Sequence, residues 1–345
     1  MEKYSKWRDA GTGIQPFLPP VPARAQQGLL GRALQAAKDY AVGPIVAVAR
    51  LAMLGALAMV DAAAAAVGTL LVVPSLQRGW SRYTRSVLAR LALLVLGFYA
   101  IDAKTVGLQR GRRLATDKAP RTDRAESGDI IIANHASYID VLYLVAKYNP
   151  VFLELDNASV RARPISMWAA LRAPARRTPA LLPAKDARPL KEITEEARLK
   201  QLGPVVVFPE NATSNGRALL RFLPVFEETE NQDDKSVLHI VALKYPFQAF
   251  SPAFSVGSQL VHLFRLACQP YNSLVVRTLE PGEAPRIADS AMYCDEGADP
   301  VDLDDAIRDK MLQLSRLRMT KLSAMDKRDF VSFYYERAKG YRRSI

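Results

Sequence analysis

From about residue 120 to about residue 280, short apolar runs alternate with helical segments. The apolar runs have the length and composition of buried strands. We predict strands at residues 130–133, 151–154, 180–183, 205–208, 238–243 and 275–279, and helices at residues 139–148, 165–172, 190–201 and 254–266. This alternation predicts an α/β fold with a central, largely parallel sheet flanked by helices. In such a fold, ligands bind beyond the carboxyl ends of the strands.

A long apolar segment precedes this pattern. Residues 44–74 carry two charged side chains, Arg50 and Asp61, and are long enough to span a bilayer, although a buried core helix has the same composition. A second apolar run, residues 86–101, contains Arg90 and is short for a full crossing. Both runs are therefore candidates for membrane association.

Basic residues flank each run and bear on its topology. The connector between the two runs carries Arg78, Arg82 and Arg85. Two full crossings would place basic loops on both sides of the membrane, against the positive-inside tendency. We therefore predict a hydrophobic helical hairpin over residues 41–105 that lies in one leaflet, with Trp80 and Tyr83 at the interface.

The two ends of the chain differ in character. Residues 1–40 form a proline-rich, irregular arm with three large apolar side chains, Trp7, Phe17 and Leu18. These side chains either anchor the arm to a surface or pack on the chain's own core. Residues 291–345 begin with an acidic linker and continue as an amphipathic helix that starts near Leu303. Its basic face suits a membrane surface, and packing on the main domain, residues 106–290, is an equal alternative.

The composition narrows the classes of function. Of the 345 residues, 49% are apolar, which is enough for a sizeable core. The net charge of +12 suits nucleic acid, an anionic lipid surface or a polyanionic cofactor. We expect no nucleic-acid partner, because the sequence has no aromatic–basic platform or known binding motif. With two cysteines and three histidines, and no C-x-x-C or H-x-x-x-H pattern, we expect neither a disulfide framework nor a bound metal.

The stretch from Asp129 to Asp140 is the first candidate for chemistry. An apolar strand ends at Asn134 and a helix begins near Ser137, so His135 lies in the turn between them. Five residues along a helix correspond to a rotation of about 500°, so His135 and Asp140 can meet only if the histidine precedes the helix. Such a pair suits a general base oriented by a carboxylate, although a structural hydrogen-bonded pair has the same spacing.

A second apolar strand, residues 205–208, ends in Pro209 and leads into a polar loop. Together the two stretches resemble the glycerophospholipid (1-acyl-glycerol-3-phosphate) acyltransferase family. The segment from His135 to Asp140 matches its H-x-x-x-x-D block, and Phe208-Pro209-Glu210 matches its F-P-E-G-T block. In the order of its segments and in both terminal regions, the chain looks similar to the fungal lysophosphatidic acid:oleoyl-CoA acyltransferases.

The resemblance implies a membrane-bound enzyme that transfers an acyl chain from acyl-CoA to lysophosphatidic acid and forms phosphatidic acid. Acyl-CoA would be a co-substrate, and no cofactor is expected. His135 would accept the proton of the glycerol hydroxyl, and Asp140 would orient the imidazole. Backbone N–H groups after Pro209 would stabilise the tetrahedral oxyanion. The partners would be acyl-CoA, a lysophospholipid and membrane lipids, and the oligomeric state is left open.

The resemblance also suggests substrate-binding residues. Glu210 would be a ligand for the glycerol hydroxyl or a scaffold for its turn. The other candidates for head-group or phosphate oxygens are Ser214, Asn215, Gly216, Arg217 and Lys185. Arginine suits phosphate recognition, but a solvated Arg217 is an equal alternative. A basic block with no intervening acid, Arg161, Arg163, Arg172, Arg176 and Arg177, either receives phosphates of CoA or the lipid or forms a solvated face.

Three positions of the second block depart from the family pattern. Asn211 stands in place of the glycine, Ala212 in place of the threonine, and Thr213 in place of the arginine that often follows. If the glycine serves a left-handed turn, Asn is the least unfavourable replacement. Two alternatives therefore stay open: an acyltransferase for another lysophospholipid, and an inert lipid-binding or membrane-organising protein on the same scaffold. We expect the endoplasmic reticulum membrane, lipid droplets or both as the location, with the catalytic domain facing the cytosol.

Overall fold

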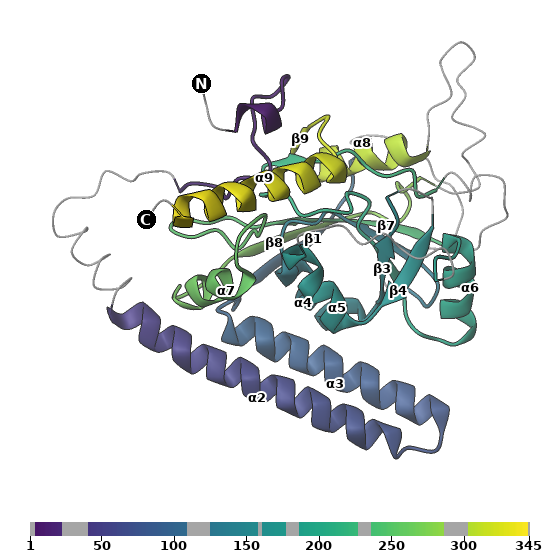
Figure 1. Ribbon diagram of the computed structural model, residues 1–345. Helices are drawn as coiled ribbons and strands as arrows, with labels where there is room; N and C mark the ends of the chain where they lie inside the picture. Colours follow the sequence, from purple (N-terminus) through teal and green to yellow (C-terminus); the bar gives the residue numbers. More distant parts are fainter. Residues whose placement is uncertain are drawn as a thin grey trace, which may run out of the picture.

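A computed structural model describes residues 4–22, 41–108, 125–157, 161–176, 186–226, 236–285 and 303–343. Within these ranges the main sheet consists of β1 (Ile101–Val106), β2 (Ile130–Ala133), β3 (Val151–Leu155), β4 (Ala162–Ile165), β5 (Val205–Val207), β7 (Leu238–Lys244) and β8 (Leu274–Leu279). Their order is β1-β8-β7-β2-β5-β3-β4. The pairs β7/β8 and β3/β4 are antiparallel, and the other neighbours are parallel. Helices flank the sheet (Figure 1), which confirms the predicted fold class.

Two strands of the main sheet and one helix that covers it differ from the prediction. The strands β1 and β4 have no counterpart in it, and β1 falls in the segment assigned to the hairpin. β1 is an edge strand that pairs with β8, and its middle residues are exposed, so it lacks the apolar run of a buried strand. Helix α7 (Gln259–Ala267) starts later than predicted, because Phe254 lies in a loop and donates its backbone N–H to the carbonyl of Ala136. The predicted strand at residues 180–183 lies outside the described residues.

The isoleucine run of β2 contributes to both layers of the core. Successive side chains of a strand point to opposite faces. Ile131 joins the cluster on one face, Ile130 and Ile132 join the cluster on the other, and all three are fully buried. The first face is covered by α3 (Pro74–Val95), α4 (Tyr138–Tyr148), α5 (Met167–Arg172) and α7, and the second by α6 (Leu190–Leu199) and α8 (Leu303–Ser315). A 3-10 turn, Ala173–Ala175, follows α5.

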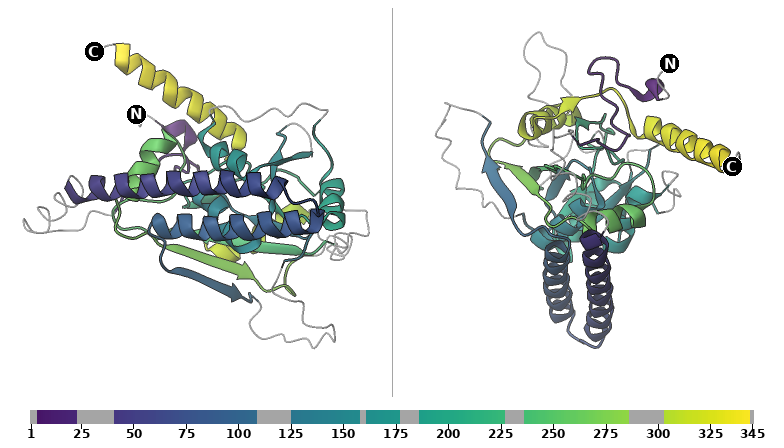
Figure 2. Two further views of the ribbon diagram at one scale, coloured as in Figure 1. Left: turned by 90° about the horizontal axis from the view of Figure 1, so that it is seen from below. Right: turned by 90° about the vertical axis from the view of Figure 1, so that its left-hand side faces the viewer.

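Helix α2 (Gly43–Thr69) runs back to back with α3 along the outside of the domain (Figures 1 and 2). Among the described residues it is the one helix long and apolar enough to cross a membrane, and 11% of its most apolar stretch is buried. Helix α3 begins at Pro74 and takes in the arginine-rich connector. The prediction of two hydrophobic helices is therefore corrected: α2 is apolar, whereas α3 is amphipathic and carries Trp80 and Tyr83.

Arg50 fastens α2 to the domain. Its buried guanidinium donates to the hydroxyl of Tyr99 (2.9 Å) and to three backbone carbonyls at the end of α7, those of Ala267 (3.0 Å), Gln269 and Pro270 (3.1 Å). The last carbonyls of a helix carry partial negative charge and need donors, so a cation is favourable there. The arginine within the apolar segment thus has a structural partner on the domain.

The C-terminal segment forms two helices where the sequence predicts one. Helix α8 ends at Ser315, and Arg316 then adopts a left-handed φ of 53°. The short strand β9 (Arg318–Met319) follows and pairs with β6 (Ala218–Leu219), before α9 (Ala324–Arg343) begins. The acidic linker before α8 lies outside the described residues.

Helix α9 packs on the N-terminal arm. The ring of Phe330 lies 5.4 Å from that of Trp7 and 5.6 Å from that of Phe17, and these three side chains are buried together with Leu220. Trp7 ends a 3-10 turn, Ser5–Trp7. For both ends of the chain, the structure therefore supports the alternative in which the apolar side chains pack on the chain itself.

We expect Arg50→Met to lower the free energy of unfolding by about 1–3 kcal/mol, because buried carbonyl groups lose their donor. Melting curves of the purified protein in detergent would measure the change. The matched control is Arg78→Met, which removes the same charge from the start of α3. An anchoring role for Arg50 is excluded if its substitution shifts the melting temperature no more than the control does.

Candidate active site

Three neighbouring parallel strands, β7, β2 and β5, end on the same edge of the sheet. Just beyond their carboxyl ends lie Tyr245, His135 and Glu210, respectively. Open α/β sheets bind ligands at this edge. The three side chains converge on one network of hydrogen bonds, which defines the candidate active site.

The turn between β2 and α4 brings His135 and Asp140 together. Nδ1 of His135 lies 3.1 Å from Oδ2 of Asp140, and both side chains are buried. Ser137 is the N-cap of α4 and Asp140 is the third residue of the helix. The histidine therefore precedes the helix that contains the aspartate, as the five-residue spacing requires.

Asp140 is fully buried and has donors on both of its oxygens. Oδ2 accepts the backbone N–H groups of Ala136 and Ser137, each at 2.8 Å, and Oδ1 accepts the hydroxyl of Tyr245. Burial and the adjacent carboxylate raise the pKa of Tyr245 well above its usual range, so this hydroxyl keeps the proton that it donates. Together these donors hold the carboxylate in one orientation.

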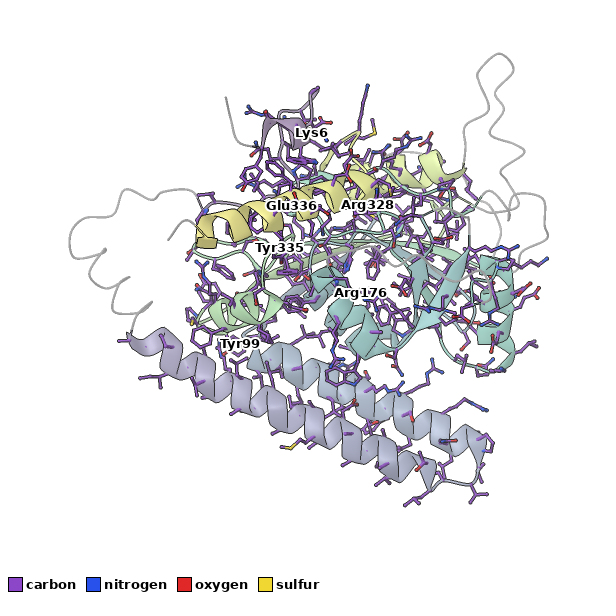
Figure 3. The ribbon with its side chains drawn as sticks, viewed as in Figure 1. Lys6, Tyr99, Arg176, Arg328, Tyr335 and Glu336 are labelled. Atoms are coloured by element: carbon purple, nitrogen blue, oxygen red, sulfur yellow. The ribbon has the colours of Figure 1, made fainter. Side chains whose placement is uncertain are left out.

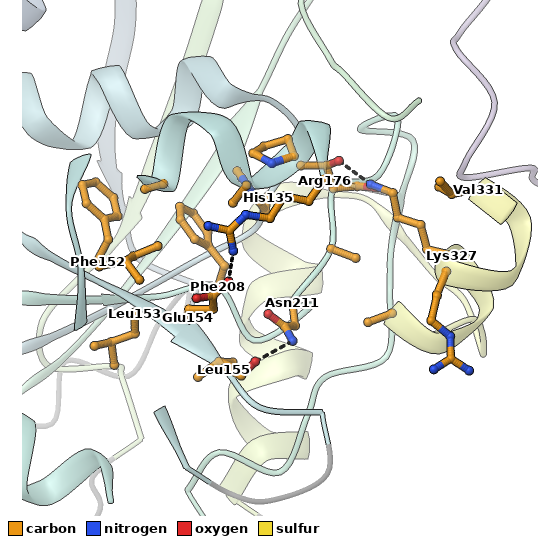
Figure 4. Close-up of a pocket in the computed structure, with 18 residues that line it drawn as sticks. His135, Phe152, Leu153, Glu154, Leu155, Arg176, Phe208, Asn211, Lys327 and Val331 are labelled. Atoms are coloured by element: carbon orange, nitrogen blue, oxygen red, sulfur yellow. Dashed lines mark hydrogen bonds and ion pairs between the residues drawn. The ribbon is translucent and has the colours of Figure 1, made fainter. Parts of the chain in front are cut away.

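The ring of His135 is fixed from a second side. It stacks on Phe208 with the ring centroids 4.2 Å apart and an angle of 20° between the planes. Because Nδ1 faces the carboxylate, the neutral ring carries its proton there and keeps a lone pair on Nε2. No group of the described residues hydrogen-bonds to Nε2, and the ring lines a cavity (Figure 4). A basic nitrogen beside a cavity can act on a bound hydroxyl.

Glu210 holds the backbone behind this pair. Its Oε1 accepts the backbone N–H of His135 and its Oε2 accepts that of Leu220, both at 2.9 Å. Burial raises the pKa of Glu210 to about 8, against the opposing effect of these two donors. Both oxygens have partners within the protein, which supports a scaffolding role for Glu210 and not the role of a ligand for the glycerol hydroxyl.

Two residues predicted to bind substrate instead hold the N-terminal arm. The side-chain amide of Asn215 donates to the carbonyls of Gln15 (2.8 Å) and Leu18 (2.9 Å). Arg217 is exposed and donates to the carbonyl of Val21 (3.2 Å). Neither residue lines the cavity at His135. In the structure, a distant part of the chain supplies the acceptors that we assigned to the substrate.

The remaining candidates of this loop also lie away from the cavity. Ser214 is buried and donates to the carbonyl of Ala218 (3.1 Å). Gly216 adopts a φ of 70°, which favours glycine, and it turns the loop. Neither lines the cavity, and the backbone N–H of Ser214 donates to the carbonyl of His135 (3.0 Å), so both residues shape the loop. Lys185 lies outside the described residues.

Asn211 forms the turn for which a glycine is usual. Its φ is 45°, in the left-handed region, and its backbone N–H donates to the carbonyl of Phe208 (2.9 Å). Its side-chain amide donates to the carbonyl of Leu155 (3.0 Å) and to Oδ1 of Asn157 (2.9 Å). The asparagine thus retains the left-handed turn and adds two bonds that a glycine lacks.

The sequence analysis did not select two residues of this region, Tyr245 and Lys327. Tyr245 directly follows the carboxyl end of β7, so the rule that selects His135 would also select it. The second residue, Lys327, lines the same cavity as His135. It has no comparable signal, because it is one of several basic residues in the C-terminal segment and reaches the cavity only through the packing of α9.

In sequence, the chain is similar to known acyltransferases. Residues 115–226 match the family model described as Acyltransferase. The chain carries an acyltransferase-family domain. Over 247 residues it is 29% identical to a Schizosaccharomyces pombe protein named "Putative lysophosphatidic acid:oleoyl-CoA acyltransferase", covering 70% of this chain and 73% of that protein. Over 221 residues it is 27% identical to the Arabidopsis thaliana protein "Lysophospholipid acyltransferase LPEAT1", covering 57% of this chain and 52% of that protein.

A solved structure is also similar. It is the 1-acyl-sn-glycerophosphate acyltransferase PlsC from Thermotoga maritima, with a TM-score of 0.38 and 15% sequence identity. The similarity covers 72% of this chain and 83% of the PlsC chain.

The turn at Asn211 yields a stability prediction. Asn211→Gly and Asn211→Ala both remove the side-chain amide, but only alanine is disfavoured at a positive φ. We therefore expect the alanine variant to be less stable than the glycine variant by about 1–2 kcal/mol. Thermal unfolding of the two variants measures the difference. Equal stabilities would show that this position is not held in the left-handed region.

Proposed function

We propose that this protein transfers an acyl chain from acyl-CoA to lysophosphatidic acid and forms phosphatidic acid. The observation that carries the proposal is the His135–Asp140 pair, with 3.1 Å between Nδ1 and Oδ2, beside a cavity at the carboxyl edge of the sheet. The acyltransferase-family domain supports acyl transfer. The name of the fission yeast relative supports the donor and the acceptor.

In the proposed reaction, Nε2 of His135 accepts the proton of the acceptor hydroxyl as its oxygen attacks the thioester carbon. Asp140 stabilises the imidazolium that forms. The new C–O bond leaves the negative charge on the former carbonyl oxygen. The tetrahedral intermediate then collapses, the C–S bond breaks, and His135 returns its proton to the CoA thiolate. No covalent enzyme intermediate is required.

Backbone donors for the oxyanion are available after Pro209. Ala212 and Thr213 both line the cavity with His135. In the described part of the chain, neither of their backbone N–H groups has an acceptor. Amide groups near a buried site normally have a partner, and a developing oxyanion would supply one. These two N–H groups are the proposed oxyanion donors.

We also propose that α2 holds the enzyme at a membrane, with the catalytic domain on the cytosolic face of the endoplasmic reticulum or of lipid droplets. Large apolar side chains of α2 are exposed, among them Ile45 (73%), Val48 (62%) and Met59 (69%). A continuous apolar surface of this kind indicates contact with another apolar phase. The length and composition of α2 fit a bilayer.

The central prediction concerns the base. We expect His135→Ala to lower kcat/KM for acyl transfer by about 10²- to 10⁴-fold, because the acceptor hydroxyl loses its proton acceptor. Purified protein would be assayed with labelled acyl-CoA and a panel of lysophospholipids. The matched control is His239→Gln, since His239 is a buried histidine that pairs with Asp129 (3.3 Å) and does not line the cavity.

The same assay separates the competing functions. Undiminished transfer by His135→Ala would remove the histidine from the mechanism. Preference for another acceptor would assign the chain to lysophospholipids of that class, in line with the name of the Arabidopsis relative. If the unmodified protein transfers an acyl chain to none of the acceptors, the inert lipid-binding function takes the place of the proposed one.

The membrane proposal is tested with vesicles of phosphatidylcholine and phosphatidylserine. We expect the double substitution Val48→Glu and Met59→Glu to reduce co-sedimentation at least about tenfold, because an acidic side chain is unfavourable in the hydrocarbon region. Leu199→Glu is the matched control, since Leu199 is an apolar residue of α6 that is 85% exposed. A loss of the same size in both proteins would mean that α2 is not the membrane-binding element.

A further inference from the structure

Lys327 projects from the first turn of α9 into the cavity that contains His135 (Figure 4). It is buried, with 8% of the residue exposed. Its Nζ donates to the carbonyl oxygen of Thr213 (2.7 Å) and to the hydroxyl of the same residue. No carboxylate of the described residues forms an ion pair with this ammonium group. Lys327 is thus a buried amine whose hydrogen-bond partners in the structure are neutral.

The charged form of Lys327 is unfavourable at this buried position unless an anion lies beside it. Burial lowers the pKa of Lys327 to about 7, and the carboxylate of Glu210 opposes the shift only in part. Glu210 itself is committed to the backbone N–H groups of His135 and Leu220. An ammonium group has three N–H donors, and Thr213 takes two of them. A ligand oxygen with negative charge would take the third and stabilise the charged form.

Besides Lys327, the described residues that line the cavity include two arginines and one carboxylate, that of Glu154. Arg176 lines the cavity and pairs with Glu154, which also pairs with Arg163 (2.7 Å). Arg163 also pairs with Asp186 (3.7 Å). Arg328, which follows Lys327 on α9 (Figure 3), lines the cavity as well and pairs with Asp329 (3.6 Å). The site is suited to a ligand with more than one negative charge, and a phosphate monoester carries about −1.5 to −2 at neutral pH.

We propose that Lys327, supported by Thr213, binds the phosphate monoester of the acceptor lipid while His135 acts on the hydroxyl of the same molecule. The inference rests on the proposed function and assigns a residue to the recognition of the acceptor's terminal phosphate. In such a lipid the hydroxyl and the phosphate-bearing oxygen sit on adjacent carbons of the glycerol, so one cavity must accommodate both. A phosphodiester head group carries less negative charge and offers one terminal oxygen fewer, so the ammonium would bind it less strongly.

Binding is tested apart from catalysis with sn-glycerol 3-phosphate, the head group without its acyl chain. We expect it to raise the melting temperature of the unmodified protein, because a ligand that binds the folded state stabilises it. The shift should be lost in Lys327→Gln, which keeps a donor for Thr213 but removes the charge, and retained in Lys327→Arg. Lys321→Gln, an exposed residue before α9, is the charge-matched control and should keep the shift. Lys327→Met replaces Lys327→Gln if the latter does not fold, since an apolar side chain of similar length is well tolerated at a buried cation.

Kinetics distinguish the acceptor from CoA, whose phosphates are a second source of the same chemistry. For Lys327→Gln we expect KM for lysophosphatidic acid to rise about 10- to 100-fold, because a hydrogen bond to a charged group is lost. KM for acyl-CoA and for lysophosphatidylethanolamine should stay within about threefold of the unmodified protein. A purely structural role would change all three values together.

Three results would overturn the inference: no shift with glycerol 3-phosphate in the unmodified protein, an equal shift in Lys327→Gln, or a rise in KM confined to acyl-CoA. Failure of the proposed function looks different. In that case the unmodified protein transfers no acyl chain, yet the melting shift and its dependence on Lys327 persist, and the phosphate site stands as a lipid head-group site.

Discussion

The buried carboxylate of Asp140 is the interaction on which the candidate active site depends. A fully buried carboxylate is stable only when donors surround it, and here the donors come from the turn before α4, from His135 and from Tyr245 after β7. The same contacts that satisfy the charge therefore fix the imidazole. Glu210 adds a second restraint, because it binds the backbone N–H of the same histidine. Asp140 holds the imidazole ring of His135, and Glu210 holds its backbone.

This network explains why the parallel order β7-β2-β5 matters for the chemistry. The three strands bring the ends of three separate segments to one edge, and each segment contributes one polar side chain. Shifting any one strand by a residue would turn its core side chains to the opposite face. The apolar core thus fixes the register, and the register fixes the donors around Asp140.

The sequence contains enough information for the parts of this arrangement that are local. The strands buried on both faces are continuous apolar runs, the spacing from His135 to Asp140 restricts how they meet, and Asn211 is compatible with a left-handed turn. Edge strands such as β1 escape prediction, because their exposed positions accept polar residues. The roles of Asn215 and Lys327 could not be predicted for another reason. A polar side chain does not reveal whether its partner will be a substrate or a backbone carbonyl 200 residues away.

The hydrogen bonds of Arg50 would affect how the protein is positioned on a lipid surface. An apolar helix joined to a domain by a free connector allows the domain to tilt and to drift from the surface. Arg50 removes that freedom, since it ties the helix to the end of α7 through several bonds at once. With α2 in a leaflet, the histidine would keep a constant height above the head groups. The lipid, and not the protein, would then make the vertical movement that brings hydroxyl and imidazole together.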